Sequence, residues 1–328
     1  MSSLSPKFSR RELMAGAAAL TALSGNLMPT AFAKAPLLGA SRPAHYRFRL
    51  GGFEITTLWD GGTKLAGPFP VFGYDQFEED VQELAEANFL PKSRMEISYT
   101  PVIVNTGKEL ILFDSGNGDL RRAAGAGRLI NGLVKAGFTP EQIDVIAITH
   151  CHPDHIGGLM ENGKPVFPNA RYLVGEGEYE FWSDPDAGSA DPPVERRARI
   201  VRDKLIPLRE KITFLKREGE VVSGINAIPS FGHTPGHLGY HIESQGKRLL
   251  LWGDAIIHHV ICLQQPDWHV SADMDKDGAA ETRKLILDMT ATERMPAIGY
   301  HMPFPAIGFV ERKGVGYRWV PASYQFDL

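Results

Sequence analysis

Residues 149–158 read THCHPDHIGG, so His150, His152, Asp154 and His155 fall within six consecutive positions. Imidazole and carboxylate are the groups that divalent Zn, Mn, Fe and Co prefer as ligands. The stretch follows residues 143–148 (IDVIAI), an apolar run short and β-branched enough to predict a buried strand. A ligand cluster on the loop that leaves a buried strand predicts a rigidly mounted metal site.

Three distant segments favour a metal site over a histidine-rich surface loop. Residues 231–237 (FGHTPGH) place His233 on a turn rich in glycine and proline. Residues 249–254 (LLLWGD) place Asp254 at the end of another apolar strand, and residues 299–303 (GYHMP) place His301 near the C-terminus. Each segment adds one metal-ligating side chain next to a predicted strand or turn, so we expect them to converge.

In this order and spacing, the HxHxDH stretch, the GHTPGH turn, the GD after a strand and the late histidine resemble the metallo-β-lactamase superfamily. Within it, the chain most resembles the methyl parathion hydrolase and lactonase branch. Further matches are residues 52–56 (GFEIT), 104–107 (VNTG), 112–116 (LFDSG) and 316–321 (GYRWVP). The resemblance implies an α/β (α+β) fold, the four-layer αβ/βα sandwich, in one hydrolase domain over residues 45–328. The run of predicted strands and helices fits two facing sheets with helices outside.

The resemblance also implies two divalent metal ions per chain, with Zn expected first and Mn, Co or Fe as alternatives. The implied ligands are His150, His152 and His233 for one ion, Asp154, His155 and His301 for the other, and Asp254 as the bridge. Two divalent ions, two carboxylates and a bridging hydroxide leave a residual positive charge. Such a charge stabilises an oxyanion or an anionic phosphorane.

The predicted function is metal-dependent hydrolysis, with the metal-bridging hydroxide as nucleophile. Asp154 and Asp254 are the candidate catalytic residues, and Asp154 doubles as a proton acceptor. The expected substrates are small-molecule lactones or aryl esters, including acyl-homoserine lactones, with side activity on phosphotriesters. The main alternative is a dedicated organophosphate hydrolase, and a further alternative is an iron-dependent oxidoreductase of the same fold. Organophosphate enzymes carry an aromatic residue where residues 120–122 read LRR, which favours a more polar or anionic substrate if these arginines face the pocket.

Four further residues have predicted roles beside an alternative structural one. Asp114 is expected to orient a ligand histidine, with a helix or turn cap as the alternative. Trp182 matches an aromatic residue of the leaving-group pocket, with core packing as the alternative. His258 is a candidate for lining the substrate pocket, although a lone histidine is more often a loop residue. His237 is expected to form structural hydrogen bonds and not to bind metal.

The N-terminal residues predict export. Arg10 and Arg11 form a twin-arginine pair, residues 15–23 are mostly small and apolar, and residues 31–33 (AFA) are a cleavage signal. Residues 1–33 are therefore predicted to be a twin-arginine signal peptide, and 34–44 a flexible leader, with the mature protein periplasmic or secreted. The apolar run is too short for a stable membrane anchor. Removing residues 1–33 leaves 32 basic and 38 acidic side chains, a net charge of −6, which argues against nucleic acid as a partner.

Local patterns predict strands within residues 45–60 and 97–115 and at 170–174, 212–215, 225–230, 238–243 and 248–252, and helices at 75–90, 120–137, 176–183, 194–211 and 277–291. Cys151 and Cys262 are expected to be free, buried thiols, because a disulfide at Cys151 would distort the metal loop. The aromatic residues between 69 and 77 suit either a lid or a homodimer contact.

Overall fold

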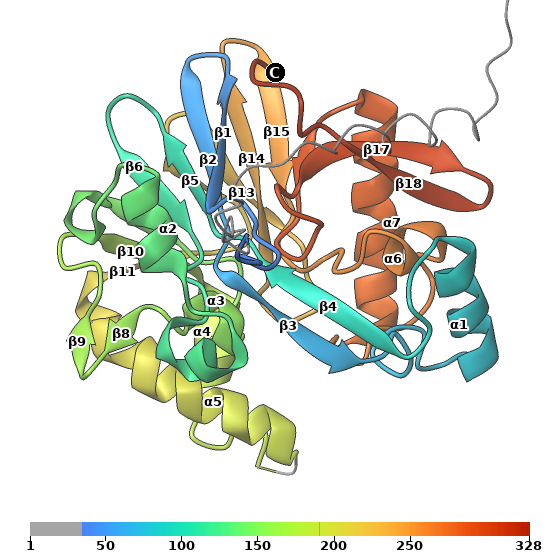
Figure 1. Ribbon diagram of the computed structural model, residues 1–328. Coiled ribbons are helices and arrows are strands. Elements are labelled where there is room, and N and C mark those ends of the chain that lie inside the picture. The colour runs from blue at the N-terminus through green and yellow to red at the C-terminus, as the bar shows by residue number, and fades with distance from the viewer. Residues whose placement is uncertain (1–34, 190) are drawn as a thin grey trace, which may run out of the picture. The chain divides into compact units, whose positions relative to one another are not determined.

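Two seven-stranded sheets form the centre of residues 43–328 (Figure 1). The computed structural model describes residues 35–189 and 191–328. The predicted signal peptide, residues 1–33, lies outside the described residues. Residues 35–43, most of the predicted leader, are exposed and contain no helix or strand.

The first sheet runs in the order β1 (His45–Leu50), β2 (Phe53–Leu58), β5 (Val102–Asn105), β6 (Leu110–Phe113), β7 (Val145–Ala147), β10 (Arg171–Gly175) and β11 (Ile212–Leu215). The second runs in the order β12 (Gly219–Val222), β13 (Ile225–Pro229), β14 (Leu238–Ser244), β15 (Lys247–Leu251), β16 (Ala297–Ile298), β17 (Ile307–Lys313) and β18 (Gly316–Pro321). Two ribbons pair β3 (Gly61–Ala66) with β4 (Arg94–Tyr99) and β8 (Met160–Glu161) with β9 (Lys164–Pro165).

The α-helices are α1 (Glu78–Ala87), α2 (Leu129–Lys135), α3 (Pro153–Ile156), α4 (Glu176–Ser183), α5 (Pro192–Lys204), α6 (Ile261–Gln264) and α7 (Lys276–Glu293). The 3₁₀ helices are η2 (Gly118–Ala124), η3 (Pro140–Gln142) and η4 (Ile206–Lys211). No helix within the two described ranges is both long and apolar enough to cross a membrane.

The central strands of the first sheet, β5, β6 and β7, are buried on both faces. Because side chains alternate along a strand, Val102 and Val104 of β5 join the core between the sheets, while Ile103 joins the core beneath the outer helices. Helices α2, α4 and α5 contribute to this outer core, and α6 and α7 pack on the other side, against the second sheet (Figure 1). The layers are therefore helix, sheet, sheet and helix, which confirms the predicted αβ/βα sandwich.

The carboxyl ends of the strands that precede the predicted ligands lie at one edge of the sandwich. Strands β6 and β7 are parallel, and β13, β15 and β16 share a direction because β14 runs antiparallel to both β13 and β15. Two hydrogen bonds join the sheets at this edge: the Leu238 amide donates to the Thr149 carbonyl (2.9 Å), and the Tyr240 hydroxyl donates to the Ile148 carbonyl (2.7 Å). The ligand loops thus start from strand ends that the core holds in place.

Two predicted helices are shorter than expected. Residues 120–137 were predicted as one helix, which is wrong: η2 and α2 are separate, because Gly125 and Gly127 between them have φ angles of 95° and 72°. At Gly127 a Cβ would lie 1.9 Å from the Gly118 carbonyl oxygen, so only glycine fits there. Helix α5 ends at Lys204, before the predicted 211, because Pro207 lacks the amide donor that would continue the α-helical hydrogen bonding, and the chain goes on as the 3₁₀ helix η4.

Four strand regions were not predicted from the sequence: strand β3 of the first ribbon, the β8–β9 ribbon, strand β12, and the β17–β18 hairpin that completes the second sheet. The β17–β18 pairing joins residues 308–313 to 316–321 in antiparallel register. The surface strand β3 mixes glycine, lysine and threonine with few apolar residues, so it lacks the apolar alternation on which the predictions depended.

Candidate metal centre

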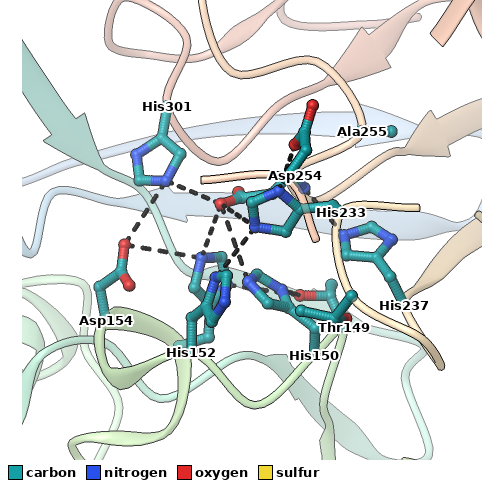
Figure 2. Close-up of polar contacts among 12 residues, drawn as sticks. Thr149, His150, His152, Asp154, His233, His237, Asp254, Ala255 and His301 are labelled. Carbon is teal, nitrogen blue, oxygen red and sulfur yellow. Dashed lines mark hydrogen bonds and ion pairs between the residues drawn. The ribbon is translucent and has the colours of Figure 1, made fainter. Parts of the chain in front are cut away.

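All seven predicted ligands meet at this edge of the sandwich (Figure 2). They form two groups, in each of which the candidate ligand atoms lie within 4.8 Å of one another. One group is His150, His152, His233 and Asp254, and the other is Asp154, His155 and His301. The first four ligands in sequence lie on the loop after β7 and on the short helix α3, and the other three follow β13, β15 and β16.

The Asp254 carboxylate occupies the middle of the cluster. Its Oδ2 atom lies 3.1 Å from Nε2 of His301, 3.4 Å from Nε2 of His155, 3.5 Å from Nε2 of His233 and 3.8 Å from Nε2 of His150. These histidines belong to both groups, so one oxygen faces both sets of ligands. This is the position of a carboxylate shared by two cations.

The donor atoms fit divalent metal ions. Nε2 of His150 and Nε2 of His155 are buried and have no hydrogen-bond partner among the described residues. A buried polar atom without a partner is unfavourable, and a metal ion would use its lone pair. Burial lowers the pKa of His150 and of His152 well below the usual value, so both imidazoles are neutral and able to bind metal.

The pKa values of His155 and His301, the histidines of the other ligand group, shift in the opposite direction. Burial acts to lower the pKa of His155 and His301, but neighbouring carboxylates, Asp254 foremost, raise both values overall. Burial in turn acts to raise the pKa of Asp254, while His301 and His155 hold it well below the usual range. Protons on these histidines therefore compensate the carboxylates, and a metal ion would have to displace them.

Several ligand histidines are oriented through their second ring nitrogen. His155 Nδ1 lies 2.8 Å from Oδ2 of Asp114. The same carboxylate accepts two hydrogen bonds from Thr149, one from the amide to Oδ1 and one from the hydroxyl to Oδ2 (2.8 Å each). His301 Nδ1 donates to the Ser98 carbonyl (2.8 Å). Asp114 thus contacts a ligand histidine directly, the geometry predicted for an orienting carboxylate.

Asp273 is a residue that the sequence analysis missed. Its Oδ1 lies 2.7 Å from Nδ1 of His233, and its Oδ2 accepts a 2.8 Å hydrogen bond from the fully buried Arg283. Arg283 also donates to the carbonyls of Pro266 and Trp268 and so joins α7 to this loop. No motif surrounds Asp273, and only the fold brings it to His233.

Glu178 on α4 was missed as well. Its side chain is fully buried and accepts four hydrogen bonds, from the Cys151 amide (2.8 Å), the Trp182 indole (2.7 Å), the Thr234 hydroxyl (2.7 Å) and the Gly236 amide (2.9 Å). Cys151 lies between two ligands of the β7 loop, and Thr234 follows the ligand of the β13 loop. One carboxylate therefore ties two ligand loops together.

His237 positions the Asp254 backbone, as predicted for a structural histidine. Its Nε2 atom accepts a 3.0 Å hydrogen bond from the Asp254 amide, and burial lowers its pKa to about 3, so the ring stays neutral. Gly253 has a φ angle of 54°, and a Cβ there would lie 2.7 Å from this ring nitrogen. The close approach of His237 thus requires glycine at position 253.

A cavity of about 460 Å³ opens over the ligands. Its lining includes Asp154, Asp254 and Arg121, together with apolar side chains of the β3–β4 ribbon and of residues 257–272. Trp182 is not among the lining residues: it is 0% exposed, in the core beneath the outer helices, and its ring lies 6.0 Å from that of His152. This placement fits the core-packing alternative.

His258 lies away from the metal ligands. It lines a separate cavity, also about 460 Å³, beside Lys64, Arg94 and His259. Its Nδ1 atom accepts hydrogen bonds from the amides of residues 260 and 261 (3.1 Å each), as in a loop histidine with satisfied hydrogen bonds. The predicted substrate contact at His258 therefore does not involve the cavity over the ligands. Cys151 and Cys262 are both free and buried, as predicted.

The fold and the ligand set agree with the comparison of this chain with known families. Residues 97–293 match the model of the metallo-beta-lactamase superfamily. The chain belongs to the metallo-beta-lactamase superfamily. The matched range contains six of the seven predicted ligands, and His301 lies just beyond it.

Relatives within this superfamily include N-acyl homoserine lactonases. The lactonase AiiA of Bacillus thuringiensis subsp. kurstaki is 30% identical over 172 residues, which cover 49% of this chain and 61% of the relative. An N-acyl homoserine lactonase of a Bacillus species is 29% identical over 161 residues, 46% of this chain and 57% of the relative. The chain thus spans less than two thirds of the length of the curated relatives it matches.

Two solved structures extend the likeness over most of the chain. AidC, a dizinc quorum-quenching lactonase in complex with the product N-hexanoyl-L-homoserine, is 29% identical, with a TM-score of 0.78, covering 85% of this chain and 97% of AidC. The hydrolase AbOPH is 28% identical, with a TM-score of 0.79, covering 86% of this chain and 98% of AbOPH.

Proposed function

We propose that this chain is a hydrolase that uses two divalent metal ions, Zn foremost. Its substrate classes are lactones, N-acyl homoserine lactones among them, and aryl esters. The observation that carries the proposal is the position of Asp254 Oδ2, within 3.1–3.8 Å of four imidazole nitrogens from both ligand groups. The likeness to a dizinc lactonase over 97% of that chain supports the same reaction class.

The chain's own residues have separable roles in this proposal. When bound, two divalent ions would supply Lewis acidity and would lower the pKa of a water molecule toward neutrality. Asp154 is only partly buried, lies in the cavity lining and faces both His155 and His301 (3.7 and 3.5 Å), so it is placed to accept a proton near the substrate. The Tyr300 hydroxyl donates to the Asp154 carbonyl (2.6 Å) and holds this backbone in place.

Side activity on phosphotriesters is a second candidate function. A pair of cations that stabilises an oxyanion also stabilises an anionic phosphorane, and apolar side chains line part of the cavity. An iron centre that reduces oxygen is a third, weaker candidate, because histidine-rich ligand sets also bind iron.

One experiment separates these candidates. Metal content and turnover of N-hexanoyl homoserine lactone, dihydrocoumarin and a phosphotriester are measured for the wild type, for Asp254→Asn and for the control Asp267→Asn. Asp267 is an exposed residue that pairs with Lys284. We expect about two Zn per chain and lactone opening that falls at least about 100-fold in Asp254→Asn and is unchanged in the control. Iron with oxygen consumption, or lactone opening by Asp254→Asn at the wild-type rate, would refute the proposal.

A further inference from the structure

The cavity over the metal ligands is unusually basic. Arg121 from η2 and Arg196 and Arg197 from α5 line it. The carboxylates that line it are those of Asp154 and Asp254, both candidate metal ligands. With two divalent ions bound, the positive charge of the ions would exceed the negative charge of these two carboxylates. The three arginines then add positive charge for which the protein supplies no counter-charge inside the cavity.

The arginines are free to bind a ligand. Within residues 35–189 and 191–328, neither Arg196 nor Arg197 lies within 4.0 Å of a carboxylate oxygen. Arg121 donates to the neutral hydroxyl of Tyr99 (2.9 Å), which aims its guanidinium without neutralising it. The neighbouring arginines are different: Arg122 pairs with Glu161 at the surface, and Arg199 lies 3.7 Å from Glu195. Among the arginines of η2 and the first turns of α5, those that line the cavity thus have no carboxylate partner, while Arg122 and Arg199 outside it lie beside one.

Arg197 is held close to other cations. It is half-buried, and burial and the charge of Arg196 lower its pKa, although Asp154 acts to raise it. Arg197 in turn contributes to lowering the pKa of His152 and of Lys276. Cations placed together in a half-buried pocket repel one another, and an anion bound among them removes that repulsion. Guanidinium groups suit carboxylate and phosphate because they donate two parallel hydrogen bonds.

We propose, on the basis of the proposed hydrolase function, that the preferred substrates are lactones or esters with a second, anionic group, carboxylate or phosphate, and that Arg197, with Arg196 and Arg121, binds that group. The rest of the cavity favours an apolar connection between this group and the scissile bond, since Leu65 and Ile97 of the β3–β4 ribbon line it. Arg197 is then a specificity-determining residue and takes no part in bond cleavage.

The test uses matched lactones that differ only at the end of the acyl chain. The metal-loaded protein is assayed with N-hexanoyl and N-adipoyl homoserine lactone, with the four-carbon pair N-butanoyl and N-succinoyl, and with a 6-phosphooxyhexanoyl analogue that distinguishes phosphate from carboxylate. The variants are Arg197→Gln and the control Arg199→Gln, which changes the same charge on the same helix outside the cavity. The readout is the ratio of kcat/KM for anionic and neutral substrates.

We expect the wild type to prefer an anionic member of a pair by about tenfold or more, and Arg197→Gln to lower the ratio by about 10–100-fold, the usual value of a hydrogen bond to a charged group. Arg199→Gln should keep the wild-type ratio. Equal loss on both substrates in Arg197→Gln, or a wild type that prefers the neutral member, would overturn the proposal.

A binding measurement keeps this proposal distinct from the hydrolase function. The dissociation constants of adipate monoamide and hexanamide are measured by calorimetry for the same three proteins. If no lactone is opened but adipate monoamide binds the wild type about tenfold more tightly than Arg197→Gln, the anion site stands and the hydrolase function fails. If adipate monoamide binds wild type and Arg197→Gln equally, the metals hold the carboxylate and the anion site is wrong.

Discussion

Replacing Glu178 by glutamine tests whether one buried carboxylate holds two metal loops in place. Each of its oxygens accepts two hydrogen bonds: one oxygen accepts from the Cys151 amide and the Trp182 indole, and the other from the Thr234 hydroxyl and the Gly236 amide. Glutamine keeps the shape but replaces one oxygen by an amide group that only donates. Neither backbone amide is able to turn into an acceptor.

The better orientation of the glutamine places its NH₂ group next to Thr234, whose hydroxyl rotates to accept. The Gly236 amide is then buried without a partner, which costs about 1–3 kcal/mol, and the three remaining bonds lose their charge assistance. The smaller desolvation cost of a neutral group offsets part of this, so we expect a net loss of about 2–3 kcal/mol of stability. The displaced loops carry His152 and His233, so metal affinity should also fall, by about 10–100-fold.

The assay measures thermal unfolding of metal-free protein and zinc affinity by competition with a chelating dye. Glu180→Gln serves as the matched control, because Glu180 is an exposed residue on the same helix α4. A loss of about 2–3 kcal/mol corresponds to a decrease in Tm of roughly 4–10 °C for a domain of this size. A Glu178→Gln protein with the Tm and the zinc affinity of the Glu180→Gln control would refute this account of the carboxylate.

Four further predictions concern the metal ligands, the bound metal and the thiols. Asp114→Asn places an amide NH₂ group beside His155 Nδ1, so we expect about 10–100-fold weaker binding of one of the two ions. The metal content after dialysis against buffered zinc measures this, and two retained ions would contradict it. Chelation should lower the Tm by about 5–10 °C. Zinc affinity should decrease as pH falls, because protons on His155 and His301 compete with the metal; a pH-independent affinity would contradict this. Burial raises the pKa of Cys151 and Cys262, so neither should react with a thiol reagent at pH 8 until guanidinium unfolds the protein, when both should.

The candidate metal-ligating side chains and the strands beside them were predictable because their signals are local. His150, His152 and Asp154 stand a few positions apart beside a buried strand, and Asp254 and His301 each follow a short apolar run. A strand buried on both faces is a continuous apolar run, so the end of each run marks where its ligand enters the site. Residue type and short-range spacing were sufficient to identify the candidate ligands, whereas their division between two ions and the four-layer sandwich were implied by the resemblance to the superfamily.

The remaining features depended on long-range packing. Asp273 reaches His233 across 40 positions, and Glu178 reaches Thr234 across 56, so neither contact leaves a periodic or motif signal near the residue itself. Arg197 lies on a helix with several other charged side chains, and its sequence neighbours do not distinguish the side chain that lines the cavity from those exposed to solvent. The sequence by itself determined which side chains are able to hold metal. Only the tertiary structure decided which carboxylates orient them and which charges face the substrate, because those contacts arise where distant strand ends and helices are brought together by the shared core.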